Sequence, residues 1–122
     1  MAVTWGSDTA LTTRTTVDNV TEEFLGTIDL SAGLQAHIQL EVDNEDTPIV
    51  DDLVVSIYTT LDDTSEVWDD TPFMQFSVTP ASTNLERQAF VVSGIYKFRI
   101  GVLSAGGTDE YTAGGDYRVR TA

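Results

Sequence analysis

The segment from Tyr58 to Phe76 gathers side chains that could catalyse hydrolysis or bind a metal ion. Its sequence, YTTLDDTSEVWDDTPFMQF, places five acidic residues around Trp68. A glycosidase needs two carboxyl groups about 5 to 10 Å apart, one as the acid and one as the base or nucleophile. Adjacent residues such as Asp69 and Asp70 do not point at one another, so no doublet is such a pair by itself. We therefore favour solvated loop carboxylates over a small hydrolase. The three doublets are Asp51-Asp52, Asp62-Asp63 and Asp69-Asp70.

Calcium binding is the second chemistry that Asp-rich loops can supply, because hard cations prefer oxygen ligands. The window Asp43-Asn44-Glu45 lacks the glycine and the spacing of the helix-loop-helix template. The window that begins at Asp62 has Val67 where the template needs glycine and Phe73 at its twelfth position. Neither window fits, so we expect no metal or other cofactor. An irregular calcium site between loops stays open as an alternative.

Nucleophilic catalysis is disfavoured by the residues that the sequence lacks. The single histidine, His37, falls between Gln35 and Gln39 on the polar side of an alternating run, which predicts a surface histidine. The chain contains no G-x-S-x-G, H-E-x-x-H, P-loop or G-x-G-x-x-G pattern. It also contains no cysteine, which excludes disulfides and thiolate sites. The sequence therefore predicts a protein that is not an enzyme.

Alternating apolar and polar residues predict the strands that must position these side chains. The cleanest alternation lies in IYKFRIGVL, residues 95–103, with Lys97 and Arg99 on the outer side. Its inward positions are Tyr96, Phe98, Ile100 and Val102. Further strands are predicted at residues 24–30, 34–42, 53–61, 74–78, 90–92 and 116–122. The apolar positions of two of these are Leu34, Ala36, Ile38, Leu40 and Val42, and Leu53, Val55, Ile57 and Leu61. Glycine-rich segments, including AGG at 113–115, are predicted turns.

Six to eight short strands separated by turns predict an all-β fold, an antiparallel β-sandwich or jelly roll, with a closed barrel as the alternative. The first residues are rich in threonine and poor in core material, which predicts an extended N-terminal arm over residues 1–20 and one β-sandwich domain over residues 21–122. Such an arm becomes ordered against a neighbour, so Trp5 and Leu11 are candidate interface residues. Deletion of residues 1–12 is accordingly expected to leave the sandwich folded.

The charge of the chain bears on its partners. The formal net charge of −14 disfavours binding to nucleic acid and to anionic membrane surfaces. No signal peptide and no apolar run long enough to span a bilayer is evident, so we expect synthesis in a cytoplasm. Five of the six basic residues fall in the last third. Of these, Arg99, Arg118 and Arg120 are candidates for a basic interface.

The environment of Trp68 leaves two functions open. An exposed aromatic residue at a hairpin tip can anchor an interface, or it can fold back over the end of the sandwich. In a carbohydrate-binding module, Trp68, Tyr58 and Tyr111 would form an aromatic platform flanked by aspartate hydrogen-bond acceptors. This module is the principal alternative to a structural protein.

Over about residues 34 to 121 the chain resembles small β-rich virion proteins encoded by tailed bacteriophages. The similarity lies in IYTTLDDTSEVWDDTPFMQFSV, RQAFVVSGIYKFRIGV and DYRVR, and mostly in the run from Ser93 to Arg99. Members of that group decorate or cement the capsid exterior or lie in head fibres. The resemblance implies a non-enzymatic protein on the outer face of the head shell, made in the host cytoplasm. It also implies the major capsid protein and further copies of the chain as partners. Because oligomers in shells obey closed symmetry, a trimer is the preferred assembly.

Overall fold

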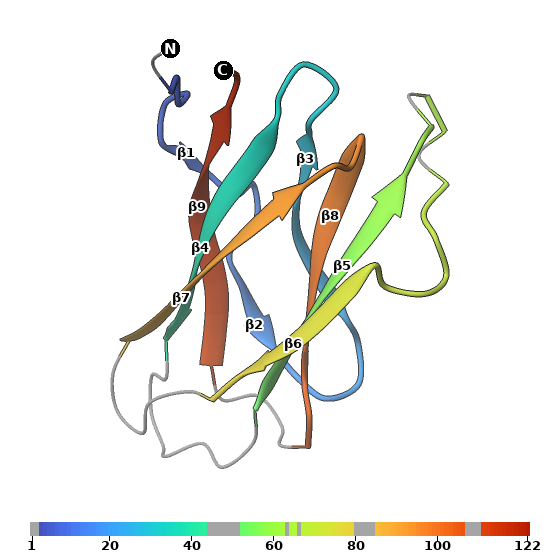
Figure 1. Cartoon of the computed structure of the whole chain (residues 1–122). Coiled ribbons are helices and arrows are strands. Elements are labelled where there is room, and N and C mark those ends of the chain that lie inside the picture. The colour runs from blue at the N-terminus through green and yellow to red at the C-terminus, as the bar shows by residue number, and fades with distance from the viewer. Residues whose placement is uncertain (1–2, 44–51, 63, 66, 80–84, 107–110) are drawn as a thin grey trace.

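A computed structural model describes residues 3–43, 52–62, 64–65, 67–79, 85–106 and 111–122 (Figure 1). All nine strands in these ranges pair antiparallel, and the same ranges contain no helix. The strands form two separate sheets that face each other across a common core, so the sandwich prediction is confirmed and the closed-barrel alternative is wrong (Figure 1).

The two sheets contain five and four strands. Sheet A consists of β1 (Thr9–Ala10), β2 (Thr15–Val17), β4 (Gln35–Asp43), β7 (Leu85–Ser93) and β9 (Tyr111–Arg120). Sheet B consists of β3 (Glu23–Asp29), β5 (Leu53–Thr60), β6 (Met74–Val78) and β8 (Lys97–Ser104). Strand β9 lies between β4 and the two short N-terminal strands, and β8 lies between β3 and β5.

The order of the strands is that of a jelly roll. Strand β2 pairs with β9, β3 with β8, β4 with β7 and β5 with β6, so the chain forms one long hairpin whose closed end is β5–β6. Rolling this hairpin adds the pairs β4–β9 and β5–β8 and creates the two sheets. Two interlocked Greek keys of this kind define the jelly roll among β-sandwiches.

The core follows the predicted period of two. Side chains at alternate positions of β4, β5 and β8 are fully buried, because one face of each strand points into the sandwich. They are Ala36, Ile38, Leu40 and Val42; Leu53, Val55 and Ile57; and Phe98, Ile100 and Val102. The pattern was extended too far at two positions, since Leu34 is 55% and Leu61 88% exposed. Leu34 precedes the start of β4 and Leu61 follows the end of β5, so neither has a core to face.

The N-terminal segment is part of the sandwich rather than a free extension. Strands β1 and β2 both pair with β9, and between them the Thr13 amide donates to the Leu25 carbonyl of β3 at 2.9 Å. Leu11 is 8% exposed and Val17 is fully buried in the core cluster. The expectation that this segment has little to pack against within its own domain is therefore corrected.

The AGG segment at residues 113–115, expected to form a turn, lies inside β9. Its glycines instead allow Arg14 and the backbone of β4 to lie close to β9. A Cβ atom on Gly115 would collide with the Gln39 carbonyl oxygen of β4, and one on Gly114 would lie 2.9 Å from the Arg14 Cγ atom. Glycine inside a strand often marks a site where another part of the chain approaches closely.

Candidate functional site

The six candidate interface residues do not form one surface. Trp5, Arg118 and Arg120 lie on the outer face of sheet A, where Trp5 forms a β-bridge with Arg120. Arg99 and Trp68 meet on the outer face of sheet B, and the Leu11 side chain is in the core, where a neighbouring subunit cannot reach it. The predicted basic face that combines Arg99 with the arginines of β9 is wrong, because these arginines belong to opposite sheets.

On sheet B, three aromatic rings surround the guanidinium group of Arg99. Its central carbon is 3.8 Å from the ring centroid of Phe24, 4.9 Å from that of Trp68 and 5.6 Å from that of Tyr58. All three distances lie within the range of cation–π attraction. The buried Nε atom of Arg99 has no hydrogen-bond partner among the described residues. Within the described residues the three rings thus surround this charge, and we call these four residues the Arg99 cluster.

Hydrogen bonds from β5 fix Trp68 over Arg99. The Thr60 hydroxyl donates to the Val67 carbonyl at 2.8 Å, and the Asp69 amide donates to the Thr59 carbonyl at 3.1 Å. The Thr59 hydroxyl also donates to the Asp69 carboxylate at 2.7 Å. Both neighbours of Trp68 are therefore anchored, and the indole folds back onto the sheet. The sequence left open whether Trp68 anchors an interface or folds back over the sandwich, and the structure has it folded back.

A carboxylate extends the Arg99 cluster at its edge. The Tyr58 hydroxyl donates to Glu22 Oε2 at 3.0 Å. A Cβ atom on Gly101 would lie 2.7 Å from Glu22 Oε1, so the glycine leaves room for the carboxylate. Burial raises the pKa of Tyr58, and the hydrogen bond to Glu22 and the charge of Glu22 raise it further.

Replacing Glu22 by Gln is expected to lower the pKa of Tyr58 toward its ordinary value, because the negative charge disappears and the amide oxygen of Gln accepts a weaker hydrogen bond than a carboxylate does. The absorbance of tyrosinate followed through an alkaline titration measures this, and Tyr58→Phe identifies the transition. Because the folded-state pKa is raised, the contribution to stability is complete below about pH 10 and is lost as the pH rises through the folded value. A Tyr58 transition that is identical in Glu22→Gln and in the control Glu23→Gln would contradict the assignment.

Lys97 was expected to point into solvent, yet it is 7% exposed. Its charge acts on Asp29 of β3 and on Asp62 of the β5–β6 loop. Hydrogen bonds from Ser31 are the main cause that lowers the pKa of Asp29. Hydrogen bonds from the amides of Thr64 and Ser65 likewise lower the pKa of Asp62. The charge of Lys97 makes a smaller contribution to both pKa values. The expectation of an exposed lysine is therefore wrong, because chain on both sides of β8 encloses it.

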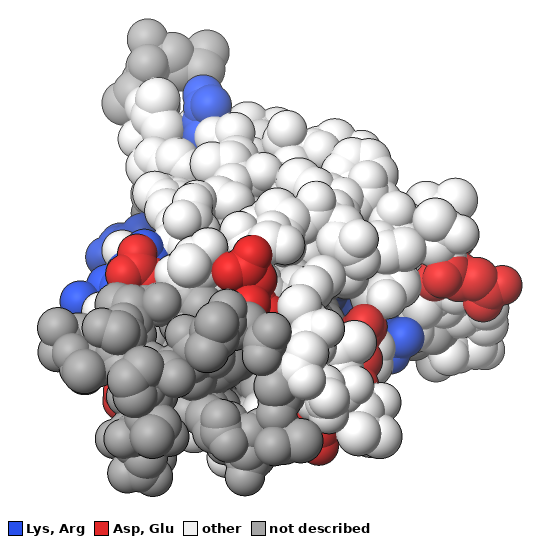
Figure 2. Space-filling view, turned by 90° about the horizontal axis from the view of Figure 1, so that it is seen from below, with Lys and Arg blue, Asp and Glu red and all other residues white. Residues whose placement is uncertain are grey.

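Three of the described carboxylates, those of Asp18, Asp29 and Asp62, cap turns. Asp18 Oδ1 accepts hydrogen bonds from the amides of Val20 and Thr21, which lowers the pKa of Asp18. Among the residues that the structure describes, no three acidic or histidine side chains gather as metal ligands. Asp51, Asp63 and part of both calcium windows lie outside the described residues. Seen from below, the described acids form separate groups among uncharged side chains (Figure 2).

The segment between β5 and β6, which carries Trp68, also presents three exposed apolar side chains. Leu61 is 88%, Val67 70% and Phe73 60% exposed. Leu61 and Phe73 line a hollow of about 320 Å³ together with Ile95 and Tyr96, which follow the turn after β7. We call these five residues the apolar end patch. The sequence marked Leu61 as core, so the patch was not predicted.

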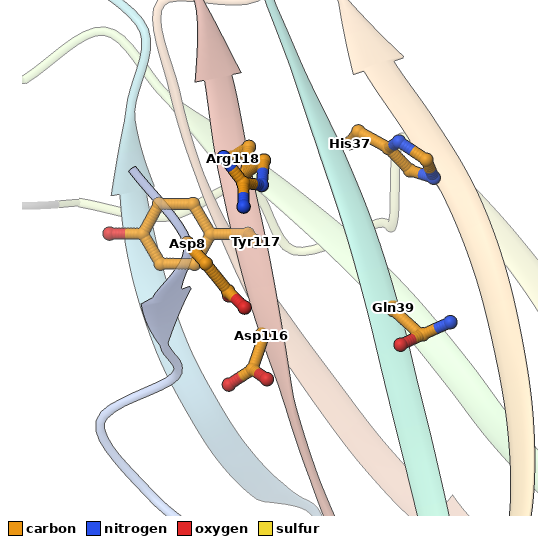
Figure 3. A pocket seen from close by; sticks show the side chains of 6 residues that line it. All are labelled: Asp8, His37, Gln39, Asp116, Tyr117 and Arg118. Carbon is orange, nitrogen blue, oxygen red and sulfur yellow. The ribbon is translucent and has the colours of Figure 1, made fainter. Parts of the chain in front are cut away.

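A second hollow, of about 170 Å³, lies on the outer face of sheet A (Figure 3). Its lining residues are Asp8, His37, Gln39, Asp116, Tyr117 and Arg118. His37 is exposed, as predicted, and its ring contacts Trp5 edge-on at 6.2 Å between centroids. Sequence analysis named Arg118 but missed the two aspartates, because their approach depends on the pairing of β1 with β9.

The carbohydrate platform expected from the sequence combines Trp68, Tyr58 and Tyr111. Trp68 and Tyr58 share the guanidinium of Arg99. Tyr111 begins β9 in the opposite sheet, and its side chain is outside the described part of the structure. In the described part of the structure, Trp68 and Tyr58 therefore face a charged group, and a platform that includes Tyr111 stays a prediction.

Comparison with known proteins gives structural likeness without sequence relatives. No protein-family model and no curated protein matches the chain. A chain of the Bacillus endospore appendages, described as disulfide-linked pili, superposes with a TM-score of 0.59 at 16% identity, over 100% of this chain and 91% of its own length. A chain of infectious bursal disease virus, Gt strain, gives 0.55 at 13% identity over 97% of this chain. The T13 particle of that virus gives 0.53 at 16% over 97%.

These likenesses establish the fold. The chain spans about a third of the viral chains, 33% and 31% of their lengths, and nearly all of the appendage chain. In the described ranges, no helix is long and apolar enough to cross a membrane.

Proposed function

We propose that the protein is a non-enzymatic structural protein of a virion, a decoration or cement protein that binds the outer face of a phage head shell. Its partners are the major capsid protein and further copies of itself, in a trimer as the preferred assembly. The likeness of the jelly roll to pilus and viral chains supports a structural role, and the resemblance of residues 34–121 supports the virion. The net charge of −14 keeps such a protein from binding packaged nucleic acid.

The apolar end patch is the observation that carries this proposal. Exposed apolar side chains on a monomer mark interaction sites when they are contiguous. Leu61, Val67 and Phe73 of this patch belong to the segment between β5 and β6, which the Arg99 cluster and the hydrogen bonds of Thr59 and Thr60 hold in place, so little conformational entropy is lost on binding. A rigid apolar surface with a hollow between Leu61 and Phe73 suits an apolar side chain of a shell subunit.

Attachment to the shell cannot use a disulfide bond. The appendage pili are named as disulfide-linked, whereas this chain contains no cysteine. Affinity for a shell must therefore come from buried area and from repeated contacts between copies, which raise the effective concentration of each further contact.

Replacing both Leu61 and Phe73 by Ser is expected to weaken binding to assembled heads at least tenfold, about 1.4 kcal/mol, because the apolar contact is lost. Heads of the encoding phage, prepared without this protein, are mixed with it and sedimented to measure the bound stoichiometry. The thermal midpoint should change little, since both side chains are exposed.

Leu34→Ser is the matched control, because Leu34 is an exposed leucine outside the patch and should bind as the unaltered protein does. Equal binding by the double variant would remove the end patch as the contact. Failure of the unaltered protein to bind heads at all would overturn the decoration function itself.

A further inference from the structure

The hollow on the outer face of sheet A joins side chains from the two ends of the chain and from its middle. Asp8 precedes β1, His37 and Gln39 belong to β4, and Asp116 and Arg118 belong to β9. The pairing of β4 with β9 places Gln39 opposite Asp116 and His37 opposite Arg118. Figure 3 shows Asp8 directed toward Asp116, with Arg118 on the same strand and the two β4 side chains beyond. Five polar side chains thus surround one open depression.

Most of these polar groups have no partner of their own. Arg118 donates one hydrogen bond, from an Nη atom to the Gly6 carbonyl at 3.1 Å. Within the described part of the chain, the side chains of Asp8, Gln39 and Asp116 make no hydrogen bond or ion pair. The hollow therefore offers carboxylate acceptors, an amide that both donates and accepts, and the remaining donors of a guanidinium.

The charges in the hollow select the class of ligand. A cation attracted by the two carboxylates meets the Arg118 guanidinium, and an anion attracted by Arg118 meets Asp8 and Asp116. A neutral ligand that carries donors and acceptors side by side meets no such repulsion. Neighbouring hydroxyl groups of a sugar ring have this arrangement, because each hydroxyl donates once and accepts twice.

Trp5 adds an aromatic group beside the hollow. Its ring is 39% exposed and is held edge-on against His37, which lines the hollow. The β-bridge between Trp5 and Arg120 fixes the backbone of this segment. An exposed indole with one apolar face is suited to cover the apolar side of a sugar ring.

We propose that this hollow is a carbohydrate-binding site, with Asp8, Gln39, Asp116 and Arg118 as the hydrogen-bonding residues and Trp5 as the stacking residue. The function is separate from shell attachment, since the apolar end patch belongs to sheet B and to the turn after β7. Because the hollow is open and leaves much of a ligand in water, the dissociation constant for one short glycan is about 1 mM. Several copies on one particle raise the avidity well beyond that value.

The test is a titration of the isotope-labelled full chain, followed by two-dimensional NMR of its amides. The probes are neutral trisaccharides of glucose, of galactose and of N-acetylglucosamine, each raised to about 10 mM. The expected result is a saturable shift of the amides of β4 around His37 and of β9 around Asp116 with at least one probe. A dissociation constant that is unchanged between low and high salt supports a neutral ligand, since salt screens charge attraction.

Variants locate the site. Asp116→Ala and Gln39→Ala are each expected to weaken binding at least tenfold, while Asp70→Ala, which removes an exposed carboxylate far from the hollow, leaves it unchanged. Trp68→Phe, in which Trp5 is the remaining tryptophan, should keep the fluorescence change that accompanies binding, and Trp5→Ala, in which Trp68 remains, should lose it. Two independent hydrogen-bonding variants keep the test valid if one of them folds poorly.

Three results would overturn the proposal. They are no saturable shift with any of the three probes, shifts confined to the Arg99 cluster, and unchanged affinity in both Asp116→Ala and Gln39→Ala. Salt-sensitive binding of a lysine-rich peptide at the hollow, without sugar binding, would identify a cation site instead. None of these outcomes depends on binding to heads, so the decoration function stands or falls separately.

Discussion

Replacing Phe98 by Ala is expected to lower the free energy of unfolding by about 3 to 5 kcal/mol. Phe98 is the largest fully buried side chain among the described residues, and it lies in β8 between Ile28 of β3 and Thr59 of β5. Its removal leaves a cavity at the centre of sheet B, which strand pairing on both sides prevents from collapsing. Unfolding in denaturant, with an unchanged slope, measures the loss.

The control for Phe98→Ala is Val91→Ala, because Val91 is half exposed and its truncation should change stability by no more than about 0.5 kcal/mol. A loss below about 1 kcal/mol for Phe98→Ala would mean that β8 faces the other way, since a shift of one residue exchanges its two faces.

Leu11→Ala is expected to cost about 2 to 5 kcal/mol, as for other buried leucines. Leu11 is 8% exposed, and its amide donates to the Gly115 carbonyl at 2.8 Å, so side chain and backbone both join the segment to the sandwich. Deleting residues 1–12 removes this leucine together with β1. The truncated chain should therefore melt at a lower temperature, whereas the sequence alone predicts that the sandwich stays folded.

Leu34→Ala removes the same atoms from an exposed position and should change stability by no more than about 0.5 kcal/mol. If Leu11→Ala were equally mild, residues 1–12 would act as an independent arm, and a contact with neighbouring copies would again be the best use for them. Thermal and denaturant melts of the two leucine variants, side by side, decide between these outcomes.

The fold was predictable for strands that bury one face in the core and expose the other, because their own sequence then shows the alternation. Strands β4, β5 and β8 alternate between core and outer residues, and this period survives any tertiary arrangement. The ends of the pattern were less certain, because apolar residues such as Leu34 and Leu61 continue the period beyond the last paired residue. The first half of β9 was not predicted as a strand, because its glycines are typical of a turn. The reason that Gly115 must lack a side chain is the neighbouring Gln39 carbonyl, which is known only from the structure.

The candidate sites were less predictable, because they depend on which strands become neighbours. Arg99 and Trp68 were identified singly, but their contact requires the β5–β6 loop to fold back over β8. The hollow on sheet A needs Asp8 beside Asp116, residues far apart in sequence that the pairing of β1 with β9 brings together. Hydrophobic periodicity indicates which face a side chain occupies and leaves its cross-strand partner open.

The pairing of the first strands with the last has a consequence for how the molecule is made. Strand β9 contacts β1, β2 and β4, so sheet A is incomplete until β9 itself has left the ribosome. Closing so long a loop costs entropy before any contact is gained, and folds dominated by distant pairs therefore form in milliseconds to seconds. Until then the edges of β2 and β4 are open to pairing with other nascent chains. The chain carries an excess of negative charge throughout this interval. Repulsion between incompletely folded copies therefore opposes their association until β9 pairs with β4.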